Sequence, residues 1–157
     1  MKIRILSAGK IDVSYLREGI ALYDSRLKHY ATVELTQVNL NRSDSRASVE
    51  VIKAKETELL MKKINPGDFV VMLHEHGKQL RSLEMAALLN EHMVRRTKKL
   101  VFVIGGPHGF SEPMFRRADL QLSLSSMTFP HQLVKLVFLE QLYRAFTIIK
   151  NEPYHNE

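Results

Sequence analysis

Two apolar runs in the last third of the sequence each end in small residues that expose backbone to a ligand. The first run, 100–104, ends in the loop GGPHG (105–109), and the second gives way to serines and a threonine in segment 123–128. Small residues permit close approach to the backbone, and open α/β sheets bind ligands outside the carboxyl ends of their strands. We therefore expect the two strand ends to lie side by side and to form a ligand-binding crevice. The plainer alternative is that the double glycine only makes a tight turn.

The usual sequence signatures of nucleotide and metal sites are missing. The glycine loop lacks the G-x-G-x-x-G spacing, the next apolar run ends in LSLS (122–125) where a dinucleotide fold has an acidic residue, and no G-K-[ST] occurs. Zero cysteines exclude a disulfide framework, a thiolate nucleophile and cysteine-ligated metal. His74 and His76 flank Glu75, but a zinc site needs a third ligand and H-E-x-x-H is absent, so we expect no metal.

Further side chains capable of chemistry occur on the last expected helix and in the tail. Arg144 follows Glu140 by four residues, so it either forms a surface ion pair or meets an anionic substrate. His131 opens the same helix, where it either packs or faces the crevice. Tyr154 and His155 follow a proline in a tail that chain ends usually leave disordered, although these residue types are unusual in a merely solvating tail.

Strands alternate with helices along the chain, which indicates an α/β fold with a mostly parallel sheet flanked by helices. The continuous apolar runs at 69–73 and 100–104 suggest strands that are buried on both faces. We expect Asp12 or Ser14 to cap the first helix and Ser82 to cap the third. The polar segment 39–48 is either a mobile solvated loop or a flexible basic loop that touches substrate. The expected strands are 2–8, 32–38, 69–73, 100–104 and a short run ending near 124, and the long helices end near 30, 63, 96 and 150.

Length and composition indicate a single globular domain spanning 1–157. The apolar fraction is 45% and the charged fraction is 25%, as in ordinary globular proteins. No run is long and apolar enough to cross a bilayer, and the N-terminus does not resemble a signal peptide, so we expect a cytoplasmic protein with no membrane partner. The net charge of +6 favours polyanionic partners, with nucleic acid first among them.

The last helix, expected from about 131 to 150, is apolar over most of its circumference. Four of its five polar residues between 133 and 149 share one narrow stripe: Glu140, Gln141, Arg144 and Thr147. One small sheet cannot cover so wide an apolar surface, whereas a second copy of the chain can. The pattern therefore predicts a homodimer built on this helix.

Taken together, these motifs resemble one family, the RlmH-type rRNA methyltransferases of the SPOUT superfamily. The resemblance covers the whole chain, and each motif alone would be weak. It rests on Leu73 with the following GK (77–78), VIGGPHG (103–109), LSLSSMTFPH (122–131), EQLYRA (140–145) and PYH (153–155). It implies a trefoil knot, S-adenosylmethionine bound in that knot, and a homodimer whose active site draws on both chains. It also implies methylation of N3 of a pseudouridine in 23S ribosomal RNA.

The resemblance also assigns roles to particular residues. Arg144, Tyr154 and His155 would face the pseudouridine, and His131 would lie close by. His155 could accept the imide proton and Arg144 could stabilise the resulting anion. Cofactor contacts would fall on Leu73, Gly105, Gly106, Ser125, Ser126, Met127, Thr128, Phe129 and Pro130.

Two other functions stay open at this point. The same scaffold could methylate another RNA position, such as a tRNA ribose, or the basic surface could serve a non-catalytic RNA-binding module. Exposed aromatic residues of the kind that read single-stranded bases are not evident in the pattern. We therefore expect recognition of the shape of a large assembly, the ribosome, rather than of a short sequence.

Overall fold

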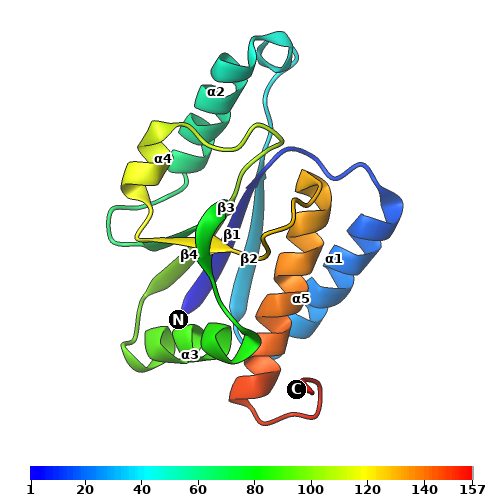
Figure 1. The fold of residues 1–157 in the computed structure, drawn as a ribbon, viewed down its shortest axis with the longest axis vertical. Coiled ribbons are helices and arrows are strands. Elements are labelled where there is room, and N and C mark those ends of the chain that lie inside the picture. Colours follow the sequence, from blue (N-terminus) through cyan, green and yellow to red (C-terminus); the bar gives the residue numbers. More distant parts are fainter. Residues whose placement is uncertain (157) are drawn as a thin grey trace.

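The computed structural model describes residues 1–156 and forms an α/β fold around one parallel sheet (Figure 1). The sheet has five strands in the order β2-β1-β4-β3-β5, and every neighbouring pair is parallel. The predicted α/β class and mostly parallel sheet are therefore confirmed. The strands are β1 (Lys2–Ala8), β2 (Thr32–Val38), β3 (Phe69–Gln79), β4 (Lys99–Ile104) and β5 (Leu120–Ser123).

Helices cover both faces of the sheet. One core cluster joins α1, α3 and α5 to alternate strand residues such as Ile5 and Phe102, and a second joins α2 and α4 to the residues between them, such as Leu6 and Val103. All of these strand residues are buried, so β4 is covered on both faces, as its continuous apolar run predicted. The helices are α1 (Ser14–Leu27), α2 (Val49–Met61), α3 (Ser82–Val94), α4 (Glu112–Arg117) and α5 (His131–Ile149), with a 3-10 turn, η1 (Asp44–Arg46).

β3 is longer than the predicted 69–73, because polar residues continue it to Gln79. Its register against β5 shifts between Leu73 and Lys78, and both of these residues pair with Leu122. Gly77 lies inside this irregularity, where a Cβ atom would sit 2.7 Å from the backbone of residues 121 and 122. Only glycine fits there, so β3 bends around the backbone of β5 at its carboxyl end.

The predicted helix caps are wrong. The residue before α1 is Val13, and the residue before α3 is Arg81; neither Asp12, Ser14 nor Ser82 supplies a cap there. The first turn of α3 is instead closed by Glu84, whose carboxylate accepts the Arg81 backbone N–H at 2.7 Å. This bond satisfies the N–H of the residue that precedes the helix, which is the role of the acidic residue in a capping box.

α5 lies between α1 and α3 on one face of the sheet (Figure 1). Gly19 of α1 allows Leu136 of α5 within 2.9 Å of its Cβ position, so the two helices approach closely. Every residue of α5 is at least half-buried, and Thr147, predicted on the polar stripe, is 0% exposed. Much of the apolar surface that suggested a second chain is thus covered within the chain itself. The homodimer and the knot stay predictions.

The loop before α2 is partly ordered by its own contacts. η1 lies within the segment 39–48, and Lys55 of α2 forms an ion pair with Asp44.

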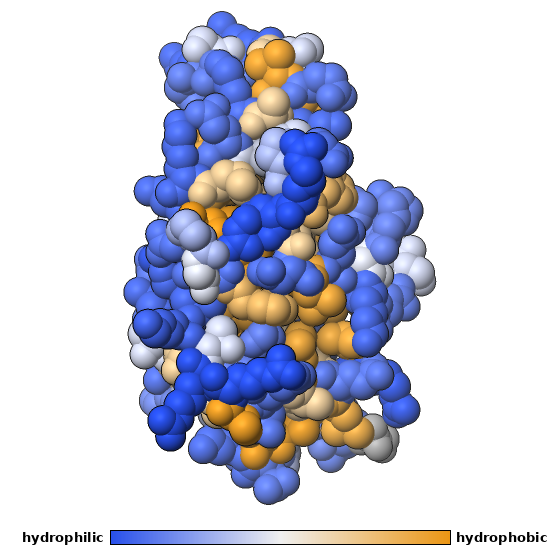
Figure 2. All heavy atoms as spheres, turned by 90° about the vertical axis from the view of Figure 1, so that its left-hand side faces the viewer, coloured by the Kyte–Doolittle hydropathy of each residue, from blue (hydrophilic) through white to orange (hydrophobic). Residues whose placement is uncertain are grey.

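On the face nearest α3 and α4, apolar side chains gather in a band between hydrophilic ones (Figure 2). Among residues 1–156, no helix is both long and apolar enough to cross a membrane.

Candidate active site

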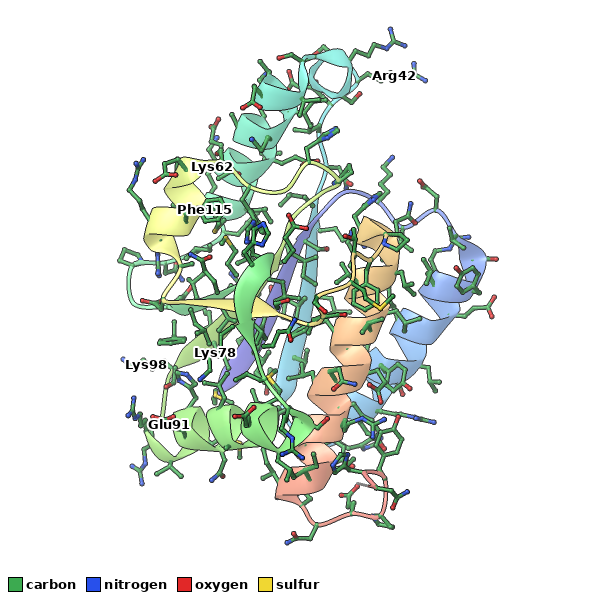
Figure 3. The ribbon with its side chains drawn as sticks, viewed as in Figure 1. Arg42, Lys62, Lys78, Glu91, Lys98 and Phe115 are labelled. Carbon is green, nitrogen blue, oxygen red and sulfur yellow. The ribbon has the colours of Figure 1, made fainter. Side chains whose placement is uncertain are left out.

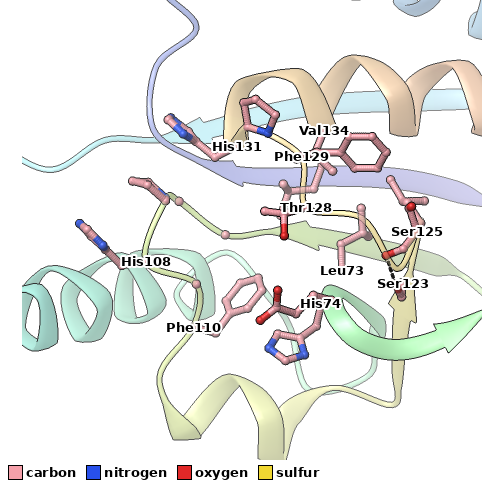
Figure 4. Close-up of a pocket in the computed structure, with 18 of the residues that line it drawn as sticks. Leu73, His74, His108, Phe110, Ser123, Ser125, Thr128, Phe129, His131 and Val134 are labelled. Carbon is pink, nitrogen blue, oxygen red and sulfur yellow. Dashed lines mark hydrogen bonds between the residues drawn. The ribbon is translucent and has the colours of Figure 1, made fainter.

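A pocket of about 740 Å³ opens at the carboxyl ends of β3, β4 and β5 (Figure 4). Its walls come from the end of β3, from the loop 104–110, and from the segments 122–125 and 127–131 that lead from β5 into α5. The volume lies within the range of pockets that hold small molecules and cofactors. The predicted crevice at this edge of the sheet is therefore present.

From the sequence we expected the two small-residue strand ends to lie side by side. They do not. β3 separates β4 from β5, and Leu73 pairs with Ile104 on one side and with Leu122 on the other. The pocket forms because β3 bends after Leu73, so that the loops after its two neighbours meet over the gap. The residues after Leu73 are polar, so the sequence did not indicate that the strand continues and bends there.

The structure brings eight of the nine predicted cofactor-binding residues into the pocket wall, together with His131. The exception is Ser126, which is not part of the wall. Its neighbours form a turn, in which Ser123 donates to the carbonyl of Ser125 and the Ser125 hydroxyl accepts the Met127 N–H, each at 2.9 Å. The predicted residues found in the wall are Leu73, Gly105, Gly106, Ser125, Met127, Thr128, Phe129, Pro130 and His131.

The glycine loop is both a tight turn and part of the pocket. The Gly109 N–H donates to the Gly106 carbonyl at 3.1 Å, and Gly109 has a φ of +74° that favours glycine. A Cβ on Gly105 would lie 3.2 Å from the ring of Phe110. The end of the loop is held against α2, because the Ser111 N–H donates to the hydroxyl of Thr57 in that helix at 3.0 Å. The loop therefore forms the tight turn and also lies in the pocket wall, and its contact with a ligand stays a prediction.

Two histidines of the pocket wall, His74 and His131, are held toward their neutral form. Burial lowers the pKa of His74 below its ordinary value, and His76 adds to this effect. Burial also lowers the pKa of His131, with a further contribution from the Lys135 ammonium. The His74 ring stands edge-on to Phe115 of α4 at 5.0 Å between centroids. Neutral imidazoles accept hydrogen bonds, so these groups suit a polar ligand.

Sequence reasoning missed several wall residues. His74 was considered only as half of a metal pair, and His108 only as part of the glycine motif. Phe115 and Lys53 come from helices on the far side of the sheet, and nothing in their spacing marks them. Only the fold brings them to the pocket.

Two buried charges lie behind the pocket wall. Lys135 of α5 is 4% exposed, and its ammonium donates to the carbonyls of Ala8 at 2.8 Å and Gly9 at 2.7 Å. Burial lowers the pKa of Lys135 to about 8, although Glu56 opposes this effect. Glu56 of α2 is 7% exposed, and its carboxylate lies against Gly106.

The predicted substrate-facing residues form a second cluster at the opposite end of α5. Arg144 donates to Oε1 of Glu140 through Nη2 at 2.6 Å and through Nε at 3.1 Å, and Tyr154 donates to the same oxygen at 3.1 Å. The Arg144 guanidinium also lies 4.9 Å from the centroid of the Tyr154 ring. The tail is thus docked on α5, and the expected ion pair is present.

His155 completes this cluster but is incompletely bonded. Arg144 Nη1 lies 3.4 Å from Nδ1 of His155, and because arginine can only donate, Nδ1 must be the acceptor. The imidazole proton then resides on Nε2, which is buried and has no partner in the part of the chain that the structure describes. Burial and hydrogen bonds raise the pKa of Tyr154, so its hydroxyl stays protonated and acts as a donor.

One chain does not bring all of the predicted site residues together. His131 and Arg144 are thirteen positions apart on a continuous helix, about 20 Å along its axis at 1.5 Å per residue. Figure 1 shows the C-terminus beside the end of α5 that is remote from the pocket. No cluster of three or more His, Asp or Glu side chains suited to a metal occurs between residues 1 and 156.

Comparison with known proteins gives a consistent match over the whole chain. Residues 1–155 match the family described as "Predicted SPOUT methyltransferase". The chain is 44% identical over 157 residues to the ribosomal RNA large subunit methyltransferase H of Parabacteroides distasonis, with 100% of both chains covered. It is 45% identical over 156 residues to the protein of that name from Christiangramia forsetii, with 99% of both covered.

Solved structures agree on the fold. A probable methylase family protein from Haemophilus influenzae superposes with a TM-score of 0.55 at 14% identity, covering 99% of this chain and 70% of that one. A probable methyltransferase from Bordetella pertussis superposes with a TM-score of 0.56 at 11% identity, covering 92% and 94%. At such low identity these likenesses concern the fold alone.

Proposed function

The chain belongs to the SPOUT methyltransferase family, and from this premise we propose that it methylates N3 of a pseudouridine in 23S ribosomal RNA with S-adenosylmethionine as donor. The observation that carries the proposal is the pocket at the carboxyl edge of the sheet, lined by small residues at two strand ends. Relatives more than 40% identical over their full length are named as methyltransferases of large-subunit ribosomal RNA, which supports the substrate.

The residues of the pocket fit S-adenosylmethionine. Apolar side chains, including Leu73, Leu122 and Phe129, offer surfaces for a flat base, and the glycine loop offers exposed backbone. The Ser125 and Thr128 hydroxyls add polar groups at the segment that enters α5. When bound, the donor supplies an electrophilic methyl group on a sulfonium. The pocket residues then have to hold it in line with the acceptor and exclude water.

We propose that a working site needs two chains. Arg144, Tyr154 and His155 lie at the far end of α5 from the pocket of their own chain, about 20 Å away along the helix axis. A homodimer would bring this cluster from one subunit to the pocket of the other. The buried Nε2–H of His155, which has no acceptor among residues 1–156, supports a neighbouring chain at this end. The apolar band of Figure 2 is surface of the kind that interfaces bury.

The acceptor chemistry assigns distinct work to the three residues. N3 of the base attacks only after it loses its proton, and the resulting anion needs a positive group nearby. Arg144 supplies that charge, for which it must exchange part of its contact with Glu140. His155 takes the proton after Arg144 releases Nδ1, and Tyr154 donates a hydrogen bond. His131, at the pocket end of α5, lies near the incoming base.

Charge supports a polyanionic substrate. The net charge is +6, and Arg42 projects from the loop between β2 and α2, at the end of the molecule toward which the strands run (Figure 3). Basic groups of this kind neutralise phosphates without reading sequence. We therefore propose that the enzyme recognises the assembled ribosome in the cytoplasm by its shape.

A tritiated-methyl transfer assay tests the function. Purified protein is incubated with labelled S-adenosylmethionine and, in parallel, with large subunits, intact ribosomes and free rRNA from cells that lack the protein. We expect label on ribosomal particles, mapped to N3 of one 23S pseudouridine. Label at another nucleotide would identify a different RNA target, and salt-sensitive RNA binding without label or donor binding would identify a non-catalytic module.

A further inference from the structure

Glu56 is a buried carboxylate that the mechanism above does not use. It lies on α2 and is 7% exposed, yet its Oε2 atom has no hydrogen-bond partner among residues 1–156. Buried carboxylate oxygens without partners are costly, and they call for an explanation. Its position supplies one, because Oε2 lies 2.5 Å from where a Cβ of Gly106 would stand. The carboxylate is therefore packed directly behind a residue of the pocket wall.

The positive charges around Glu56 do not fully offset the cost of burying its carboxylate. His108 of the glycine loop and Lys135 of α5 are the groups that act on it electrostatically, and both favour its charged form. The Lys135 ammonium is nevertheless committed to the carbonyls of Ala8 and Gly9. Burial outweighs both neighbours and raises the pKa of Glu56 above its ordinary value. A positive charge brought into the pocket would therefore favour the charged form of Glu56.

We propose that Glu56 is a specificity-determining residue that makes the pocket prefer the cationic methyl donor to the neutral product. The inference rests on the proposed function. Methyl transfer breaks the bond between carbon and sulfur, and the bonding electrons stay on sulfur while a new carbon–nitrogen bond forms. The sulfonium thereby becomes an uncharged thioether. A buried carboxylate close behind the wall attracts the first and not the second, since Coulomb interactions are weakly screened inside a protein.

Because the ligand loses its charge in the reaction, Glu56 would favour release of the product after each turnover. The donor is held by attraction before the reaction, and that attraction disappears when its charge does. Release of the product is then favoured without any movement of the protein. Glycine at position 106 is part of the arrangement, because a larger residue would displace the carboxylate from the wall.

Isothermal titration calorimetry on the full-length protein tests the inference with two ligands, S-adenosylmethionine and S-adenosylhomocysteine. For Glu56→Gln, which keeps the shape and removes the charge, we expect affinity for the donor to fall roughly tenfold and affinity for the product to change less than about twofold. The matched control is Glu58→Gln, which makes the same charge change at an exposed position on α2. It should leave both affinities unchanged.

The ratio of the two affinities separates an electrostatic role from a structural one. Equal losses for donor and product in Glu56→Gln, or an unchanged ratio, would overturn the inference. Glu56→Asp keeps the charge, so it should retain the wild-type ratio even if both affinities fall; a ratio like that of the glutamine variant would count against it. If the wild-type protein bound neither ligand, the proposed function itself would fail, which is a different result.

Discussion

The two ends of α5 differ in which buried polar group lacks a hydrogen-bond partner. At the pocket end, His131 and Lys135 have pKa values lowered by burial, and Oε2 of the Glu56 carboxylate behind the wall has no partner among residues 1–156. At the tail end, Arg144 and Tyr154 both donate to Glu140, and aromatic rings pack around them. The buried carboxylate oxygen at the pocket end suits the proposed small cationic ligand. The buried Nε2–H of His155 at the tail end, which has no acceptor among residues 1–156, suits the proposed second chain.

The same comparison separates binding from chemistry. One helix carries the residues near the proposed donor at one end and those near the proposed acceptor at the other. Variants at the two ends should therefore change different measurements: donor affinity at the pocket end, and turnover at the tail end.

Arg144→Ala should produce the largest effect. Loss of the cation that stabilises the imide anion should lower kcat by about 10²–10³-fold, as does removal of other groups that stabilise developing charge. Donor affinity should stay at the wild-type value, because Arg144 is proposed to act on the acceptor base and not on the donor. Methyl-transfer rates at saturating donor and calorimetry measure the two quantities.

Arg95→Ala serves as the control for this variant. It removes an arginine from an equivalent i,i+4 ion pair, with Glu91, on the surface of α3. Full activity is expected. Were Arg144→Ala to weaken donor binding as strongly as turnover, the two ends would not act separately.

Gly77→Ala should have the next largest effect, because it would distort the pocket wall. A Cβ at this position meets the backbone of residues 121 and 122 at 2.7 Å, and backbone cannot move aside as a side chain does. We expect a loss of about 2–3 kcal/mol in the free energy of unfolding, as for other overpacked sites, together with weaker donor binding. Thermal unfolding and calorimetry check this. Gly67→Ala, with nothing within 4 Å of its Cβ position, should change neither.

Lys135 should make stability depend on pH in a defined direction. Its pKa is about 8 in the folded chain and 10.5 ordinarily, so between these values the unfolded state binds more protons. The free energy of unfolding should therefore rise with pH across this window. Relative to Lys135→Met, the wild-type protein should gain about 2 kcal/mol between pH 7.5 and pH 10. Urea unfolding at equal protein concentrations measures it; a difference that is constant with pH would contradict the buried charge.

Tyr154→Phe should have the smallest effect, at the tail end. It removes the hydroxyl that donates to Glu140 at 3.1 Å and lies 3.3 Å from the Tyr23 hydroxyl. We expect a loss of about 1 kcal/mol in stability, the usual value for such bonds, with unchanged donor affinity. Tyr15→Phe, at a side chain that is 63% exposed, is the comparison and should be neutral. A loss of donor affinity in Tyr154→Phe would mean that the tail also takes part in donor binding, which would contradict the separate roles proposed for the two ends of α5.

Local pattern was sufficient to predict most elements and part of the pocket wall. The run 100–104 is apolar at every position because both faces of β4 are covered, and this can be read from sequence. The small residues after β4 and β5 likewise indicated the crevice in which the pocket lies. Such features depend on a residue's own neighbours in the chain.

Features that depend on distant contacts were not predictable. β3 continues through the polar residues 74–79 because the backbone of β5 pairs with it, and that pairing joins segments about fifty positions apart. The packing of Glu56 behind Gly106 has the same origin. The packing of α1 and α3 against α5 was not predictable either. The sequence therefore overestimated how much apolar surface of α5 is left for a second chain to cover.

Activity of mixed subunits tests most directly whether the two ends of α5 act in different chains. Arg144→Ala is mixed in equal amounts with a pocket variant, Gly106→Leu, under conditions that allow subunit exchange, and methyl transfer to ribosomes is measured. Each variant alone should be inactive. With random exchange half of the dimers are mixed and one of their two sites is intact, so about a quarter of wild-type activity should return. A mixture as inactive as its components would contradict a site shared between two chains.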